Sequence, residues 1–187
     1  MSAEEIKKSA LKCFSQYGYG GTSLSMITAE IGMKKQSVYA HFKSKEDIYM
    51  SVLNSVIQDE EEFLDEYFSK NYNNAAECLN NFLTIIKERY ISHNEYNMKF
   101  IIGVSYMPPE KLAPIVNTKC NSYFDKIATK VVEVISKFNN DATQKEKKML
   151  AFTTILVGLF SALMYRDIEV YEKRQQACWE LFIKNNI

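Results

Sequence analysis

Glycine and proline are scarce in this chain, with six Gly and three Pro among 187 residues. So few turn-forming residues argue against many short strands and favour long helices. The four cysteines are scattered and form no C-x-x-C pair, which argues against a disulfide framework or a zinc site and fits a reducing cytoplasm. The sequence has two histidines and contains no phosphate-binding loop and no nucleophile-elbow motif. We therefore expect no enzyme active site. It also lacks an apolar leader with a basic start, so we expect no secretion.

Net charge is zero, because 23 Lys and Arg residues balance 23 Asp and Glu residues. The charges are nevertheless unevenly placed. All four charged side chains between Ile31 and Lys45 are lysines, whereas carboxylates gather in the run Asp59–Glu62. A basic end on an acidic body is typical of a protein that contacts DNA with one end.

One long uncharged run, Met149–Tyr165, raises the question of a membrane span. At 17 residues it lies at the lower limit for crossing a bilayer, and Thr, Gly and Ser dilute its apolar character. We therefore expect a helix buried in protein on most sides and no membrane partner.

Apolar residues recur at helical spacing along the chain, and nothing favours a strand. Gly18, Gly32 and the pair Pro108-Pro109 mark expected helix ends or turns. Ser23 or Thr22 can cap the second helix, and Ser44 with Asp47 can cap the fourth. The expected fold is all-α, with about nine helices over residues 3–17, 24–31, 35–42, 45–68, 75–92, 96–106, from Pro109 to 138, 142–166 and 169–185.

Two short helices around Gly32, over residues 23–42, form an expected helix-turn-helix. Residues 6–53 resemble the N-terminal domain of the TetR family of bacterial transcriptional regulators. The matching positions are Phe14, Tyr17-Gly18, Gly21-Thr22-Ser23, Ile27, Gly32, Val38-Tyr39, His41-Phe42 and Lys45-Glu46. The resemblance implies a three-helix DNA-binding domain over residues 1–47 and a larger helical ligand-binding and dimerisation domain over residues 48–187.

The family resemblance also implies roles for individual side chains. Phosphate contacts that position the protein are expected from Tyr39, His41, Lys45 and either Thr22 or Ser23. Base readout falls to Lys34, Lys35, Gln36 and Ser37 at the start of the recognition helix, although each lysine could equally contact a phosphate. No cofactor or metal is implied.

A single recognition helix makes few contacts, so we expect a homodimer on a palindromic operator of double-stranded DNA. The last two helices are the expected interface, through Thr154, Gly158, Phe160, Ala162, Cys178, Leu181 and Phe182. The middle helices carry aromatic and sulfur side chains suited to a small, largely apolar or aromatic effector. The candidate ligand residues are Phe82, Ile86, Arg89, Tyr90, His93, Phe100, Met107, Tyr123 and Phe124.

The leading interpretation is a cytoplasmic, ligand-responsive repressor, and transcriptional activation remains open. A thiol-based redox sensor on the same fold is the main alternative. It would need an exposed cysteine of low pKa, whereas periodicity places Cys13 and Cys78 on buried faces.

Overall fold

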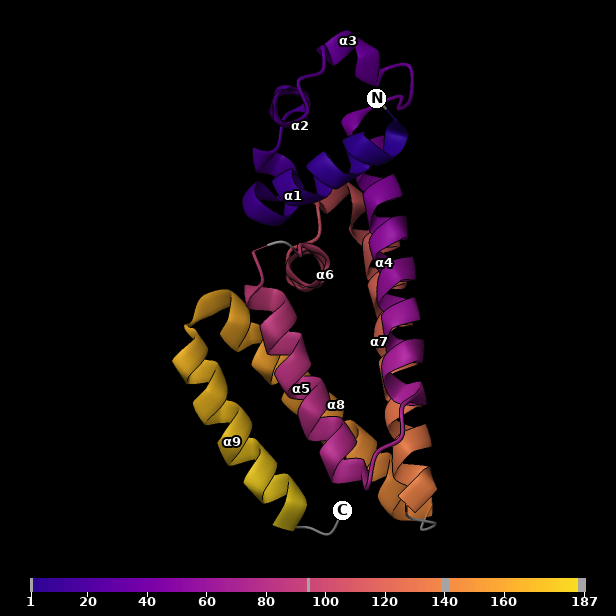
Figure 1. Cartoon of the computed structure of the whole chain (residues 1–187), viewed down its shortest axis with the longest axis vertical. Helices are drawn as coiled ribbons and strands as arrows, with labels where there is room; N and C mark the ends of the chain where they lie inside the picture. The colour runs from indigo at the N-terminus through magenta and orange to yellow at the C-terminus, as the bar shows by residue number, and fades with distance from the viewer. Residues whose placement is uncertain (1, 94, 139–141, 185–187) are drawn as a thin grey trace. The chain divides into compact units, whose positions relative to one another are not determined.

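The computed structural model describes residues 2–93, 95–138 and 142–184. Over these residues the structure is all-α, with nine α-helices, one 3-10 segment and no strand (Figure 1). This confirms the predicted fold class. The chain forms two compact units, and each is built from two separate stretches of sequence.

The first unit, called unit 1 here, contains residues 1–60 and 93–120. It holds α1 (Ala3–Gly21), α2 (Leu24–Glu30), α3 (Lys35–Val38), the first part of α4 (Lys45–Ser69), α6 (Asn97–Tyr106), the 3-10 segment η1 (Glu110–Leu112) and the start of α7 (Ala113–Phe138). Although α6 follows α1 by more than seventy residues, the two helices pack against each other.

An aromatic cluster forms part of the core of unit 1. The ring of Tyr49 meets Phe14 and Tyr19 edge-on, with both centroid distances 5.1 Å, and lies 5.6 Å from Phe100 of α6. Tyr49 is fully buried, and the described residues give its hydroxyl no hydrogen-bond partner. Burial raises the pKa of this phenol, so it stays protonated.

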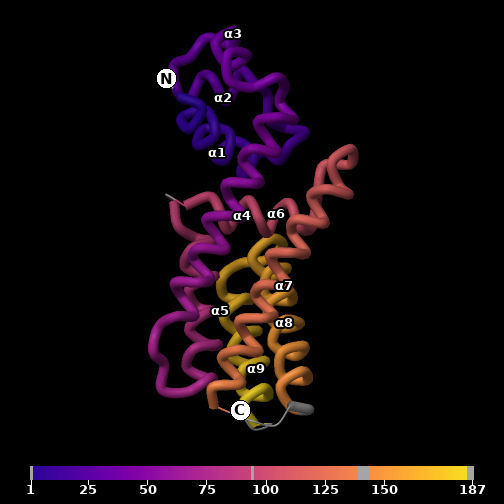
Figure 2. The backbone as a smooth tube through the Cα atoms, turned by 90° about the vertical axis from the view of Figure 1, so that its right-hand side faces the viewer, coloured from indigo at the N-terminus to yellow at the C-terminus, as the bar shows by residue number. Residues whose placement is uncertain are grey.

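Unit 2 contains residues 61–92 and 121–187. It holds the remainders of α4 and α7 together with α5 (Ala75–Ile91), α8 (Ala142–Tyr165) and α9 (Ile168–Lys184). Helices α8 and α9 lie side by side (Figure 2), and the buried hydroxyl of Tyr171 in α9 donates to the Leu83 carbonyl of α5 at 2.7 Å. Phe152 of α8 lies between Phe82 and Phe182, with ring centroids 6.5 and 6.1 Å away.

The helix ends follow the expected chemistry. Gly18 has φ of 66° and interrupts α1, and Gly32 has φ of 62° in the turn between α2 and α3; both angles are strained for any residue with a Cβ. Ser44 accepts from the Asp47 amide at 3.1 Å, and the Asp47 carboxylate accepts from the Lys43 amide at 2.8 Å. The expected break at 139–141 and the end of the last helix at residue 185 lie outside the described residues.

The recognition helix is shorter than expected. α3 covers Lys35–Val38, whereas the sequence predicted helix to residue 42. Beyond Val38 the chain continues as hydrogen-bonded turns, in which Ala40 donates to Ser37 and both His41 and Phe42 donate to Val38. Tyr39 and His41 therefore follow the helix on a fixed turn.

α8 differs most from expectation. The stretch Gln144–Tyr165 is long and apolar enough to cross a membrane by length and composition, yet its most apolar window is only 39% buried. A helix buried on most sides was expected, so that prediction is wrong within one subunit. Exposed apolar side chains therefore remain along α8.

Candidate nucleic-acid interface and subunit face

The recognition segment divides cleanly into buried and exposed positions. Val38 and Phe42 are 1% and 7% exposed and anchor the segment in the core of unit 1. Six candidate DNA-contacting residues lie before Val38 or between Val38 and Phe42, and all six are exposed: Lys34, Lys35, Gln36, Ser37, Tyr39 and His41. Apolar anchoring on one side leaves donors and cations projecting on the other, which is the arrangement a groove-binding helix requires.

Thr22 and Ser23 have different roles. Thr22 is 2% exposed and its hydroxyl donates to the Gly18 carbonyl at 2.8 Å. Ser23 is exposed and caps α2 by accepting from the Met26 amide at 3.2 Å. A phosphate contact was expected from either Thr22 or Ser23. Because the Thr22 side chain is turned inward, Ser23, at the amino end of α2, is the better candidate.

Lys45 is engaged within its own subunit. Its ammonium donates to the carbonyls of Tyr19 and Thr22, at 2.8 and 2.9 Å, and lies 4.2 Å from the centroid of the Tyr19 ring. The expected role was a cation facing a DNA phosphate. In this structure the carbonyls at the end of α1, which carry partial negative charge, hold the lysine, and its phosphate contact stays a prediction.

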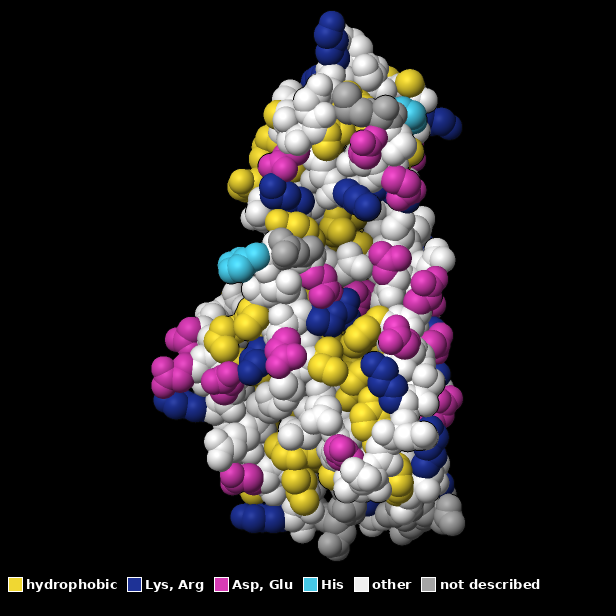
Figure 3. Space-filling view, viewed as in Figure 1, with side chains coloured by type: hydrophobic (Ala, Val, Ile, Leu, Met, Phe, Trp, Pro, Cys, Tyr) yellow, Lys and Arg dark blue, Asp and Glu magenta, His cyan; other side chains and the backbone are white. Residues whose placement is uncertain are grey.

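The electrostatics of this end of unit 1 favour an anionic partner. The Glu30 carboxylate, at the end of α2, pairs with Lys12 at 2.7 Å, and this bond raises the pKa of the lysine. From Ile31 to Lys45 no other carboxylate follows. On the face drawn in Figure 3, Lys and Arg side chains project at the end that carries α3.

In unit 2, the residues expected at the dimer interface separate into two groups. Phe160, Ala162 and Phe182 are 1%, 0% and 8% exposed, so within one chain they pack mainly inside unit 2, and their part in a subunit interface stays a prediction. Thr154, Gly158 and Leu181 are exposed, and Cys178 is half-buried.

The exposed side of α8 also carries residues that the sequence analysis missed. Leu150, Val157 and Tyr165 are 53%, 48% and 58% exposed. With Thr154, Gly158 and Leu181 they form what we call the α8–α9 face. The spacing 150, 154, 157, 158 and 165 follows one side of a 3.6-residue helix, so a stricter helical projection would have found it.

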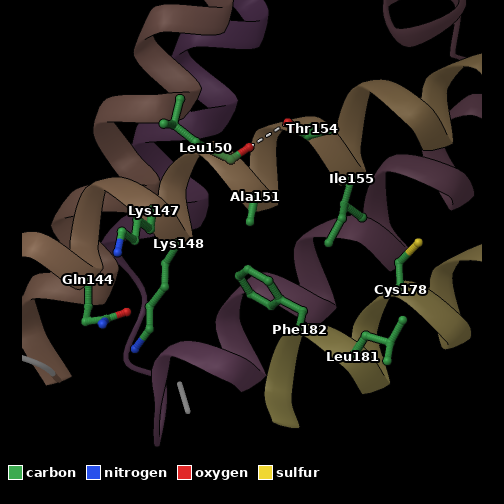
Figure 4. A pocket seen from close by; sticks show the side chains of 10 residues that line it. All are labelled: Gln144, Lys147, Lys148, Leu150, Ala151, Thr154, Ile155, Cys178, Leu181 and Phe182. Atoms are coloured by element: carbon green, nitrogen blue, oxygen red, sulfur yellow. Dashed lines mark hydrogen bonds between the residues drawn. The ribbon is translucent and has the colours of Figure 1, made fainter. Parts of the chain in front are cut away.

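A hollow of about 670 Å³ opens between the start of α8 and the end of α9. In Figure 4, Ala151 of α8 and Phe182 of α9 point toward one another across it. Its lining is apolar apart from two lysines and two polar groups, and consists of Gln144, Lys147, Lys148, Leu150, Ala151, Thr154, Ile155, Cys178, Leu181 and Phe182.

None of the nine candidate ligand residues lines that hollow. Within unit 2, Phe82, Ile86 and Tyr123 are fully buried, and Tyr90 and Phe124 are half-buried. Arg89 lies over the Phe63 ring, 4.1 Å from its centroid. Within unit 1, Phe100 is buried in the aromatic cluster, whereas Met107 and His93 are exposed. Their part in ligand binding stays a prediction.

The cysteines do not resemble reactive thiols. Cys13, Cys78 and Cys120 are at most 3% exposed, as periodicity predicted for the first two. Burial raises the pKa of all three thiols, that of Cys78 to about 12 and that of Cys120 to about 11. Since the thiolate is the reactive form, these three residues are poor redox sensors.

The amino-acid sequence of this chain is similar in part to a known family and to curated regulators. Residues 6–52 match the family model described as bacterial regulatory proteins of the tetR family. Over 90 residues the chain is 32% identical to the biofilm operon icaADBC HTH-type negative transcriptional regulator IcaR of Staphylococcus epidermidis, and 34% identical over 97 residues to that of Staphylococcus aureus. The matches cover 47% of this chain, and the chain spans about half the length of these curated relatives, 49% in each case.

Solved structures resemble the whole fold. A TetR transcriptional regulator from Legionella pneumophila superposes with a TM-score of 0.74 at 20% identity, covering 99% of this chain and 97% of the other. The regulator FadR from Bacillus subtilis, in complex with stearoyl-CoA, gives 0.69 at 16% identity and covers 97% and 98%. At these identities the likeness concerns the fold.

Proposed function

We propose that the chain is a transcriptional repressor of the TetR family, because residues 6–52 match the model of that family of bacterial regulatory proteins. It acts in the cytoplasm, where it binds a palindromic DNA operator as a homodimer and is released by a small, largely apolar or aromatic ligand. The observation that carries DNA binding is the recognition segment, whose exposed donors and lysines surround a buried Val38 and Phe42. The matched relatives named as negative regulators support repression.

The proposed contacts are of two kinds: contacts to phosphates position the protein on the duplex, and contacts to base edges read the sequence. Tyr39, His41 and Ser23 donate hydrogen bonds to phosphate oxygens, which fixes the register of α3 on the duplex. Lys34, Lys35, Gln36 and Ser37 lie at the start of α3, the end that enters the major groove. A lysine there suits guanine O6 and N7, and the Gln36 amide suits adenine N6 and N7.

The exposed α8–α9 face supports the homodimer. Leu150, Val157 and Leu181 would leave water on association, and Gly158 permits close approach because it has no side chain and the space beside it, beyond its own helical turn, is open. Two copies related by a two-fold axis would present two recognition helices to half-sites about 34 Å apart.

The proposed ligand is the least defined partner. The aromatic residues of α5 and α7 support an apolar or aromatic effector, and the complex of the similarly folded FadR with stearoyl-CoA supports a ligand with a large apolar part. To act as a switch, the ligand must bind more tightly to a dimer whose recognition helices no longer match the half-site spacing.

A genomic fragment library tests DNA binding directly. The purified chain, titrated against the library at low salt, should retain a subset of fragments that share a palindrome, and moderate salt should release the others. Retention of no fragment above background would refute the proposed function.

Tyr39→Phe tests the positioning role. Removing one hydroxyl that donates to a phosphate should weaken binding to operator and to random DNA alike, by about two- to tenfold for each subunit. Fluorescence anisotropy on both duplexes measures this. A changed preference between them would assign Tyr39 to base readout instead.

Gln36→Ala tests sequence readout. Loss of an amide pair should relax preference at one base pair in each half-site, where discrimination is worth about 1–3 kcal/mol. Binding to a set of single-base operator variants provides the measurement, with Ser25→Ala on the exposed side of α2 as the control. An unaltered base profile would remove Gln36 from the readers.

A further inference from the structure

Residues 18–23, from the interruption of α1 at Gly18 to the cap of α2, are called the α1–α2 connection here, and they contain three glycines, Gly18, Gly20 and Gly21. Such a segment gains much conformational freedom when nothing restrains it. Its far end is Ser23, the cap of α2 and a proposed phosphate contact. Order in this connection therefore decides where the amino end of α2 lies.

Lys45, the first residue of α4, restrains this connection. Its ammonium donates to two carbonyls, those of Tyr19 and Thr22, which stand on either side of the Gly20-Gly21 pair. The Tyr19 ring approaches the same ammonium, with its centroid 4.2 Å away, which is within the range of a cation–π contact. Tyr19 in turn packs on Phe14 and Tyr49.

Two of the three ammonium donors of Lys45 are thus used by backbone carbonyls, and an aromatic face lies beside the group. The neighbouring hydroxyl of Thr22 closes the same turn onto Gly18. By contrast, Lys34 and Lys35 on the recognition segment are exposed. The lysines near the DNA-binding end consequently fall into two kinds, one turned into the fold and the others toward solvent.

We propose that Lys45 is a positioning residue, which holds the α1–α2 connection so that Ser23 and the amino end of α2 meet the DNA backbone. It contributes to affinity by ordering this connection and not by neutralising a phosphate. This inference rests on the proposed DNA binding.

Salt dependence separates the two roles. Each phosphate neutralised by a cation adds about 0.9 to the slope of log K against log salt. Lys45→Met should weaken operator binding by about tenfold through a disordered connection, with the slope unchanged. In the comparison variant, Lys35→Met, the lost cation lies on exposed α3 and approaches the duplex whether it faces a base or a phosphate, so the slope should fall by up to about 0.9 per subunit. Far-ultraviolet circular dichroism at the assay temperature establishes that each variant is folded.

Lys45→Gln supplies the second comparison and guards against a misfolded methionine variant. Its amide has no charge but can donate to the same two carbonyls, so affinity should stay within about threefold of the original protein. A direct phosphate contact predicts the opposite, a shallower slope for Lys45→Gln and for Lys45→Met.

A double substitution shows whether Lys45 acts through Ser23. If it does, Lys45→Met should cost less affinity in a Ser23→Ala background than in the original chain, because the two changes disturb one contact. Three results would each overturn the positioning role. The first is a salt slope of the Lys45 variants lowered as in Lys35→Met, and the second is a double variant whose affinity losses add fully. The third is an operator affinity of Lys45→Met equal to that of the original protein. Absence of DNA binding by the unaltered protein would instead refute the proposed function.

Discussion

Tyr49→Ala should lower the thermal unfolding midpoint strongly, whereas Tyr49→Phe should raise it. The alanine variant leaves a cavity among Phe14, Tyr19 and Phe100, and truncation of a large buried aromatic residue costs about 3–5 kcal/mol. For a chain of this length each kcal/mol shifts the midpoint by about 2–4 °C. The expected fall is therefore about 10 °C.

The phenylalanine variant keeps the ring and removes only the hydroxyl. That hydroxyl is buried, and the described residues give it no hydrogen-bond partner. A buried unpaired polar group costs about 1–3 kcal/mol, so its removal should stabilise the protein by an amount of this order. Differential scanning calorimetry of the three proteins measures both effects. A phenylalanine variant that melts below the original protein would show that the hydroxyl has a partner in solution.

Gly158→Leu should separate the dimer and abolish tight operator binding. Beyond its sequence neighbours and its own helical turn, a Cβ at Gly158 would meet no atom within 4 Å, and the residue is exposed on α8. The subunit should therefore accept leucine, which also favours helix more than glycine does. In a two-fold interface the added side chain occurs twice. At about 1–3 kcal/mol for each of the two overpacked sites, the dimer dissociation constant should rise by about 30-fold or more.

Sedimentation equilibrium measures the dimer, and operator binding is followed on the same samples. Thr129→Leu is the matched control, because Thr129 is exposed on α7 and the change also introduces a leucine. It should remain dimeric and bind DNA. An intact Gly158→Leu dimer would move the subunit contact away from the α8–α9 face.

Helix positions and caps followed from the sequence because they depend on local spacing and on single side chains. Ile48, Val52 and Val56 recur at helical spacing on α4 and are buried, and Ser44 caps that helix as predicted. The exposed and buried sides of the recognition segment could be predicted for the same reason. These features require nothing beyond a 3.6-residue repeat and a hydroxyl at a helix start.

Thr154, Gly158 and Ala162, all expected at the interface, form a row with steps of four residues, and only the first two are exposed within one chain. Each step of four residues turns a helix by about 40° beyond a full turn, so two steps rotate the row by about 80°. Ala162 has therefore turned into the core of unit 2, while Val157 remains on the exposed side. Phe160 and Phe182 were chosen by residue type, which cannot distinguish an intramolecular core from a subunit contact.

The partner of Lys45 could not be predicted, because it depends on where the end of α1 lies in three dimensions. A lysine at a helix start next to a DNA-binding segment suits a phosphate equally well by sequence. The functional division at residue 47 stays a prediction. Compact packing divides the chain elsewhere, because residues 93–120 join residues 1–60.

Because residues 93–120 pack with residues 1–60, the first unit cannot be excised from the chain as one continuous fragment. A fragment of the first sixty residues would lack α6, so Phe100 would no longer cover Tyr49 and helix α1 would lose a neighbour. Such a fragment would expose aromatic surface and tend to associate nonspecifically. A chimera that transplants this DNA-binding end onto another effector body would have to carry both segments together.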